Sequence, residues 1–228
     1  LKAKQQGLID HIVFSSHCNS RELAAIISEG CFEGVTLGYN ILNHPYREEG
    51  LKVAHEKDLG VATMNPLGGG LIPDNPEYFS FIKGSDDHTV AEAAIRFNAG
   101  HKEISTVLCG MGSMDEVLQN AAMGDRVKEF SDEEIARIKS RSTSAMNELC
   151  TGCMYCKGCP RDIPIEKFID VYNLQILNAT ESDMSNRLKY HWGLDSSLAA
   201  ECIECGQCEE KCTQHLPIIQ RLKEMSRL

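Results

Sequence analysis

Short apolar runs alternate with amphipathic segments along roughly the first 125 residues, and this alternation is the strongest signal for the fold. The apolar runs are bounded by polar or glycine-rich turns, which is typical of strands. We therefore expect four strands, at residues 12–15, 34–37, 60–64 and 104–109. A helical spacing of apolar positions follows and predicts helices at residues 21–28, 47–57, 88–97 and 113–123. A long loop rich in glycine and proline, residues 65–84, follows the third strand.

Alternating strands and helices produce a parallel sheet with helical crossovers, so the expected fold class is α/β. Four strand–helix units are half of the eight that close a TIM barrel. A half barrel leaves two unpaired sheet edges, which folded proteins manage explicitly. The chain also begins with Leu1 rather than Met. Together these features predict that further strand–helix units precede this chain in a longer protein.

The pattern changes near residue 130. Residues 132–146 form a polar, helix-forming stretch, and helical patterns follow at 165–177 and 216–225 without strand alternation. We therefore expect two domains. Residues 1–130 form half of a (β/α) barrel, and residues 131–228 form a small, mainly helical domain.

Most of the eleven cysteines lie in two tight runs in the second domain. The runs are Cys150, Cys153, Cys156 and Cys159, and Cys202, Cys205, Cys208 and Cys212. Each run ends shortly before an apolar–Pro–Ile triplet that a predicted helix follows, so the two runs are repeats of one another. Cysteines at this spacing in an irregular loop reach different corners of a cubane cluster. The sequence predicts two 4Fe-4S clusters in a ferredoxin-like domain, with electron transfer as the first functional hypothesis.

Other readings of the cysteines remain open. Two Cys-x-x-Cys pairs can hold a tetrahedral zinc ion, although zinc sites usually use separated pairs. A secreted disulfide scaffold spreads its cysteines along the chain, whereas the first 149 residues hold only Cys18, Cys31 and Cys109, which we interpret as buried thiols. In two-cluster ferredoxins the fourth cysteine of each run binds the other cluster. The shorter spacing before Cys159 leaves that partition open here.

Charge and hydropathy restrict the expected partners. The chain has 23 basic and 33 acidic residues and a net charge of −10, which disfavours nucleic acid as a partner. No apolar run is long enough to predict a membrane span. Cluster motifs and free thiols fit a reducing compartment, so we expect the protein to be cytoplasmic.

Four motifs in the first domain occur in the order and spacing of a known family. They are residues 12–17 (IVFSSH), 35–40 (VTLGYN), 64–70 (MNPLGGG) and 110–113 (GMGS), the last followed by Gln119 and Asn120. This part of the chain resembles the C-terminal half of an aldo/keto reductase. The cysteine-rich tail resembles the branch of that family with a C-terminal ferredoxin-like domain. The resemblance implies the C-terminal half of a (β/α)8 TIM barrel followed by the iron–sulfur domain.

The resemblance also implies a nicotinamide dinucleotide, NAD(P), extended over the C-terminal mouth of the barrel. Ser15 and Ser16 match the pair that holds the nicotinamide carboxamide, with Ser16 in place of Asn. Thr36 stands where Gln is frequent, and Met64 where a stacking aromatic residue is frequent. The other matched positions are Pro66, Leu67 and Gly68 for the pyrophosphate loop, and Gly110, Gly112, Ser113, Gln119 and Asn120 for the adenosine end.

Two departures from the family pattern change the expected chemistry. NADP-preferring members place Lys or Arg beside the 2′-phosphate, whereas this chain has Glu116 in the matching segment. We expect a weaker NADP preference, the use of NAD, or a degenerate site. The catalytic Tyr of the family, with its Lys, Asp and His, belongs to the first half of the barrel. No catalytic residue is therefore assigned, and this chain alone is expected to be inactive.

Three functions follow from these features. The first is an oxidoreductase that transfers hydride between NAD(P) and a small carbonyl or alcohol, with clusters that exchange electrons with a ferredoxin or another redox partner. The second is an electron-transfer protein whose barrel is a scaffold that binds no nucleotide. The third is a structural metal domain that mediates subunit association.

Overall fold

A computed structural model describes residues 1–85, 87–141 and 148–228 of the chain. Its contacts divide the chain into two units, Leu1–Thr143 and Ser144–Leu228, which are described separately. This division lies later than residue 130, where the sequence pattern changes, because α7 (Asp132–Arg141) contacts elements of the first unit. The helix predicted at 132–146 is observed as far as Arg141. Its expected end lies outside the described residues.

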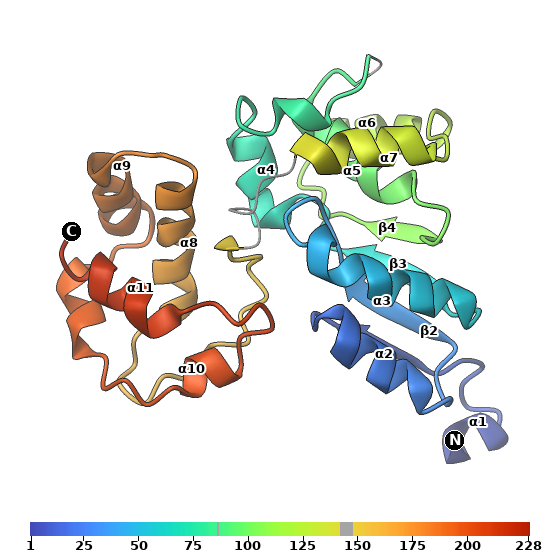
Figure 1. Ribbon diagram of the computed structural model, residues 1–228, viewed down its shortest axis with the longest axis horizontal. Coiled ribbons are helices and arrows are strands. Elements are labelled where there is room, and N and C mark those ends of the chain that lie inside the picture. Colours follow the sequence, from blue (N-terminus) through green and yellow to red (C-terminus); the bar gives the residue numbers. More distant parts are fainter. Residues whose placement is uncertain (86, 142–147) are drawn as a thin grey trace. The chain divides into compact units, whose positions relative to one another are not determined.

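The first unit is built on a parallel sheet, as the sequence predicts. The strands are β1 (Val13–Ser16), β2 (Gly34–Gly38), β3 (Gly60–Met64) and β4 (Thr106–Leu108). They lie in the order β1-β2-β3-β4, and every neighbouring pair is parallel (Figure 1). The α/β class and the (β/α) architecture are therefore confirmed. All four carboxyl ends lie at one edge of the sheet, because the strands are parallel.

One face of this sheet is buried and the other is open. Val35, Leu37 and Val61 are each at most 2% exposed and form the core with the crossover helices. Val13 and Leu108 point to the opposite face and are 61% and 47% exposed. Successive side chains of a strand point to opposite faces, so the open face also carries the alternate residues of the central strands.

The crossover helices follow their predicted positions closely. They are α2 (Ser20–Ser28), α3 (His44–Glu56), α5 (Val90–Ala99) and α6 (Met114–Gly124). Asn19 and Thr89 begin α2 and α5 with complete capping boxes, which satisfy backbone donors of the first turn. Helix α3 begins before the predicted residue 47, because Pro45 in its first turn has the φ angle that a helix start requires.

The predicted loop at 65–84 contains short helical segments. They are η1 (Gly68–Gly70), α4 (Leu71–Asp74) and η2 (Ser80–Ile82). Ile72, Phe79 and Ile82 are fully buried, and this burial holds the turns in place. A further short helix, α1 (Lys2–Gln5), precedes the first strand.

The second unit is helical, as predicted. Its elements are α8 (Ile165–Ile176), α9 (Glu181–Asn186), a π-helical turn (Arg187–His191), a 3₁₀ turn (Ser196–Glu201), α10 (Gln207–Glu210) and α11 (Ile218–Met225). The core joins Phe168 and Ile169 of α8 to Leu188 and to Leu222 and Met225 of α11. The short elements between residues 181 and 210 were not predicted. No helix among the described residues is long and apolar enough to cross a membrane.

Candidate cluster sites and the carboxyl edge of the sheet

The two cysteine runs adopt the same backbone conformation at equivalent positions. Two left-handed residues recur in both runs, and in the first run they are Gly152 (φ 69°) and Met154 (φ 64°); Gly158 (φ 90°) is a third, without a counterpart in the second run. In the second they are Glu204 (φ 55°) and Gly206 (φ 78°), two and four residues after the first cysteine in both cases. Backbones that switch between right- and left-handed residues form concave nests of N–H groups, which are found at iron–sulfur and phosphate sites.

The segments after the runs repeat as well. Asp162 (φ 54°) and His215 (φ 53°) are both left-handed. Each donates its backbone N–H at 3.0 Å to the carbonyl of the last cysteine of its run, Cys159 or Cys212. A proline then precedes α8 in the first copy and α11 in the second. The repeat read from the sequence is thus a repeat of backbone structure.

The first three thiols of the first run lie together with the last thiol of the second. Burial raises the pKa of Cys150 to about 12, and the neighbouring thiols of Cys153, Cys156 and Cys212 contribute to that rise. Burial likewise raises the pKa of Cys156 to about 12. Thiolates at these positions require a compensating positive charge, which bound iron supplies.

The second run faces the last thiol of the first. One cavity is lined by thiols of both runs, namely Cys156, Cys159, Cys202, Cys205 and Cys208. Burial raises the pKa of Cys208 to about 11, and the carboxylate of Glu209 adds to the rise. Within the described ranges, no three His, Cys, Asp or Glu side chains are arranged to hold a single metal ion. A cubane binds each thiolate to a different iron, so its ligands need not converge on one point.

The surroundings of these thiols fit a cluster. The core of the second unit packs directly against cysteines of both runs, and it includes Ile163 and Ile165, which follow the first run in the chain, and Leu216 and Ile218, which follow the second. An apolar shell limits the access of water and strengthens interactions between a cluster and nearby charges. The backbone nests and this shell together make the two sites suitable for iron–sulfur clusters.

Two polar residues beside the first run have no counterpart among the sequence predictions. Asn173 of α8 is 3% exposed, accepts from the N–H of Cys150 at 2.7 Å and donates to its carbonyl at 2.9 Å. Arg221 of α11 is 2% exposed and donates to the carbonyl of Glu148 at 2.7 Å. Both lie on apolar helix faces, and a polar residue at a position where the helical pattern expects an apolar one is the sequence signal that could have identified them.

The residues predicted for the nicotinamide end lie at the carboxyl edge of the sheet, but on different faces. Ser15 pairs with Thr36 in the strand register, and both lie on the open face. Ser16 is 4% exposed on the covered side, where its hydroxyl lies 2.7 Å from the sulfur of Cys18. Met64 ends β3 at the same edge and is half-buried. The structure therefore brings Ser15 and Thr36 together on the open face, with Ser16 on the other.

The predicted pyrophosphate loop follows β3 and is tightly anchored. Asn40 donates from its side chain to the carbonyl of Asn65 at 2.7 Å, and Pro66 is buried. Gly68 has φ 62°, and a Cβ added there would lie 2.8 Å from Leu42. Only glycine satisfies both conditions, so the loop has a defined shape, with Leu67 half-buried beside it.

The predicted adenosine end surrounds the N-terminus of α6. Ser113 caps the helix and accepts from the N–H of Glu116 at 3.2 Å. The Glu116 carboxylate accepts from the N–H of Gly112 at 2.6 Å. Gly110, Gly112, Ser113 and Gln119 are exposed, and Asn120 is half-buried. The carboxylate therefore occupies a backbone donor in the segment where the adenosine end is expected.

A buried arginine joins the ends of β1 and β2. Arg47 of α3 is fully buried and donates to the carbonyls of His17 and Gly38, and to that of Cys18 at 3.2 Å. Burial and the charge of Arg47 lower the pKa of His17 to about 4, so His17 is neutral at pH 7. Arg47 thus fixes the backbone that follows Ser15 and Ser16.

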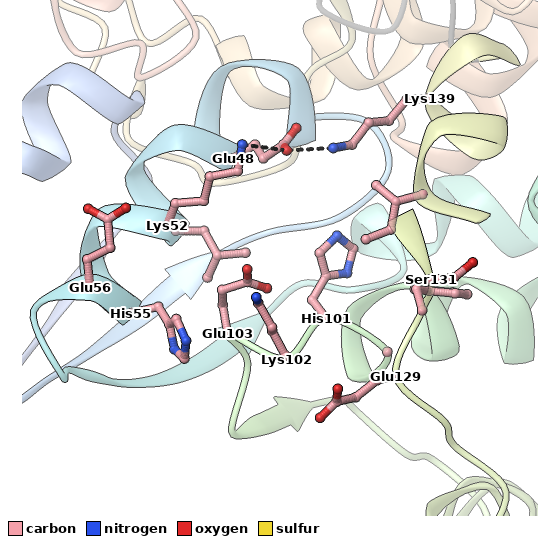
Figure 2. A pocket seen from close by; sticks show the side chains of 14 residues that line it. Glu48, Lys52, His55, Glu56, His101, Lys102, Glu103, Glu129, Ser131 and Lys139 are labelled. Atoms are coloured by element: carbon pink, nitrogen blue, oxygen red, sulfur yellow. Dashed lines mark hydrogen bonds and ion pairs between the residues drawn. The ribbon is translucent and has the colours of Figure 1, made fainter. Parts of the chain in front are cut away.

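The first unit also contains a cavity of about 640 Å³ (Figure 2). It is lined by α3, the segment after α5, and α7, with charged groups of both signs. Lys139 and Lys52 pair with Glu48 at 2.5 and 3.2 Å along its wall. None of the residues predicted to bind nucleotide or cluster is among those that line it.

Comparisons with known proteins agree with the division of the chain into two units. The family model for the aldo/keto reductase family matches residues 1–142, and that for the 4Fe-4S dicluster domain matches residues 149–217. Among solved structures, the chain is similar to the aldo-keto reductase AKR11C1 from Bacillus halodurans, in its holo and apo forms. Each form gives a TM-score of 0.52 at 20% identity, over 63% of this chain and 54% of that one. The chain thus spans about half the length of these proteins. No curated protein matches it.

Proposed function

The chain belongs to the aldo/keto reductase family, and on that basis we propose that the full-length protein is an iron–sulfur oxidoreductase that transfers hydride between NAD(P) and a small carbonyl or alcohol. It carries two 4Fe-4S clusters, which exchange single electrons with a ferredoxin or another redox partner. The reducing cytoplasm is its compartment, in keeping with its free thiols.

The observation that carries this proposal is the duplicated backbone around the eight cysteines. Cys150, Cys153, Cys156 and Cys212 hold the first cluster, and Cys159, Cys202, Cys205 and Cys208 hold the second. The neighbours that raise the pKa of Cys150, namely Cys153, Cys156 and Cys212, support the first set. The cavity that Cys159 lines with Cys202, Cys205 and Cys208 supports the second set, and Cys156 borders both groups. The crossing of the fourth ligand ties the two runs into one unit, so loss of either cluster weakens the other site.

The nucleotide is assigned to the open face and carboxyl edge of the sheet. The nicotinamide ring supplies the hydride chemistry when bound. Ser15 and Thr36 present hydroxyl groups on that face, and the adenosine end is assigned to the exposed residues at the start of α6. Glu116 already accepts from Gly112 there, and its charge opposes a 2′-phosphate. This arrangement favours NAD over NADP.

The test is made on the full-length protein, purified without oxygen. Iron and labile sulfide are measured first, and then oxidation of NADH and NADPH with small aldehydes and ketones as acceptors. We expect iron and sulfide at roughly eight atoms per chain, and carbonyl-dependent oxidation that is faster with NADH. Zinc without labile sulfide, or full clusters without nucleotide-dependent turnover, would contradict the proposal.

One observation favours the second candidate, an electron-transfer protein whose barrel is a scaffold. Ser16 stands at the position of an amide ligand in the family, yet it is buried and contacts Cys18. In that case the clusters cycle with a one-electron partner while neither nucleotide binds. Titration of the full-length protein with NADH and NADPH separates the two functions.

A further inference from the structure

The two cluster sites have equivalent backbones but different charges around them. Helices α8 and α11 begin at equivalent residues, Ile165 and Ile218. Three residues further on, α8 has the buried Phe168 and α11 has the buried Arg221. A cation thus stands in one copy of the repeat where the other copy has an apolar ring.

Arg221 lies close to the first site. Its guanidinium carbon is 4.7 Å from the centre of the Tyr172 ring, and it donates to the carbonyl of Glu148, two residues before Cys150. Burial lowers the pKa of Arg221, whereas nearby groups that carry negative charge, Cys150 and Cys212 among them, raise it. These two cysteines belong to the thiol group assigned above to the first cluster. Arg221 is therefore a fixed charge next to that group.

The charge of Arg221 is only partly offset. Among the described residues, no carboxylate lies within ion-pair distance of it. The carboxylates of Glu148 and Glu224 interact with it electrostatically. Glu224 accepts from the Tyr172 hydroxyl at 2.6 Å and is half-buried, so water screens part of its charge.

The residues that directly follow the third cysteine of each run also differ in charge, with a cation in the first run and a carboxylate in the second. Lys157 follows Cys156, whereas Glu209 follows Cys208. Lys157 is 55% exposed and lies 4.0 Å from Glu166, so its effect is largely cancelled. Glu209 accepts from the N–H of Ile219 at 2.8 Å and lies close enough to Cys208 to raise its pKa. Each site also has an opposing charge, since Glu166 lies close enough to Cys156 to raise its pKa and Lys211 lines the cavity of the second run. The difference that remains is Arg221, the one charged side chain that is buried among the described residues of the second unit.

Reduction of a cluster adds one negative charge. A buried cation stabilises the reduced form, and a nearby carboxylate destabilises it, most strongly where the surroundings are apolar. We propose that Arg221 sets the order of reduction, so that an electron from a one-electron donor comes to rest on the first cluster, the one assigned to Cys150, Cys153, Cys156 and Cys212, before the second is reduced. This proposal rests on the two clusters of the proposed function and assigns each of them a place in the electron path.

The test is a potentiometric titration of the anaerobic full-length protein with dithionite, followed by electron paramagnetic resonance. The wild-type protein is expected to show two one-electron steps. In Arg221→Met the reduction potential of the higher step is expected to fall by about 59 mV or more, which is a tenfold change in the equilibrium constant for one electron. The potential of the other step is expected to stay unchanged. Arg221→Lys keeps the charge and is expected to retain most of the difference.

Two further variants control for charge and for folding. Lys189→Met removes an exposed cation of the same unit, where Lys189 lies 5.5 Å from the centre of the Tyr190 ring, and both steps are expected to stay unchanged. Glu224→Gln removes the carboxylate nearest to Tyr172 without opening the core, and is expected to raise the higher step. This variant decides the question if Arg221→Met does not fold.

Iron and sulfide analysis separates the two levels of the argument. A wild-type protein without two clusters contradicts the proposed function. Two intact clusters whose steps do not move in Arg221→Met, or in Glu224→Gln if the first variant fails to fold, overturn the role of Arg221 and leave the proposed function standing.

Discussion

Replacement of Arg47 by Met is expected to destabilise the first unit strongly. Met retains much of the length and the apolar stem of Arg47 but removes every donor. The carbonyls of His17, Cys18 and Gly38 then lose their charged partner in a buried setting. At about 1–1.5 kcal/mol net for each lost hydrogen bond, the total is about 3–5 kcal/mol, which is also the range measured when one partner of a buried charged contact is removed.

The assay is urea unfolding followed by two signals. The single tryptophan, Trp192, lies in the second unit, so its fluorescence follows that unit, while far-ultraviolet circular dichroism follows both. With an m-value of about 2 kcal/mol per molar, a loss of about 4 kcal/mol lowers the midpoint of the first unit by about 2 M. The tryptophan transition is expected to stay unchanged.

Arg21→Met is the matched control, because Arg21 is an exposed arginine of the same unit. Its effect is expected to stay within about 0.5 kcal/mol. If Arg47→Met changes the free energy of unfolding by less than about 1 kcal/mol, the carbonyls find other partners at little cost, and the role given to Arg47 is wrong.

Three other outcomes are expected. Cys153→Ser lowers iron and sulfide per chain by roughly half, whereas Cys31→Ser changes neither, as measured by metal analysis. Burial lowers the pKa of His44 to about 4, so between pH 6.5 and 4 the unfolded chain takes up a proton that the folded chain refuses. Folding stability therefore falls with decreasing pH, by at most about 1.4 kcal/mol per pH unit from this group, and a His44→Gln variant loses part of that slope in urea titrations at each pH. Glu116→Arg is expected to shift nucleotide preference of the full-length protein toward NADPH, measured as the ratio of the two dissociation constants; an unchanged ratio would show that Glu116 lies away from the 2′ position.

The strands and most crossover helices were predictable, because their signals are local. Val35, Leu37 and Val61 alternate with smaller or polar residues, and a strand period of two needs no knowledge of the rest of the fold. Asn19 and Thr89 begin helices through contacts within three residues. The backbone repeat was predictable for the same reason, since cysteine spacing is read directly from the chain.

The polar contacts within the core were not predictable, because they join residues far apart in sequence. Arg47 reads as a helix residue, and only the fold shows which three carbonyls it holds. From two different helices, Asn173 bonds to the backbone of Cys150 and Arg221 bonds to the carbonyl of Glu148, two residues earlier. The orientation of Ser16 depends on the register of β1, and a match by position in a motif does not define which face of the sheet a side chain occupies.

The left-handed residues of the two runs have a consequence for how the holoprotein is made. At the two left-handed positions that the runs share, each run has one glycine and one residue with a side chain, in opposite order: Gly152 and Met154, then Glu204 and Gly206. The left-handed conformation costs Met154 and Glu204 about 1–2 kcal/mol each. Thiol–iron bonds can supply this energy, so neither loop is at its conformational minimum before the metal arrives. Assembly of the clusters is then a folding step of the second unit, and a cell short of iron would accumulate a chain whose first unit is formed and whose second is a ready substrate for proteases.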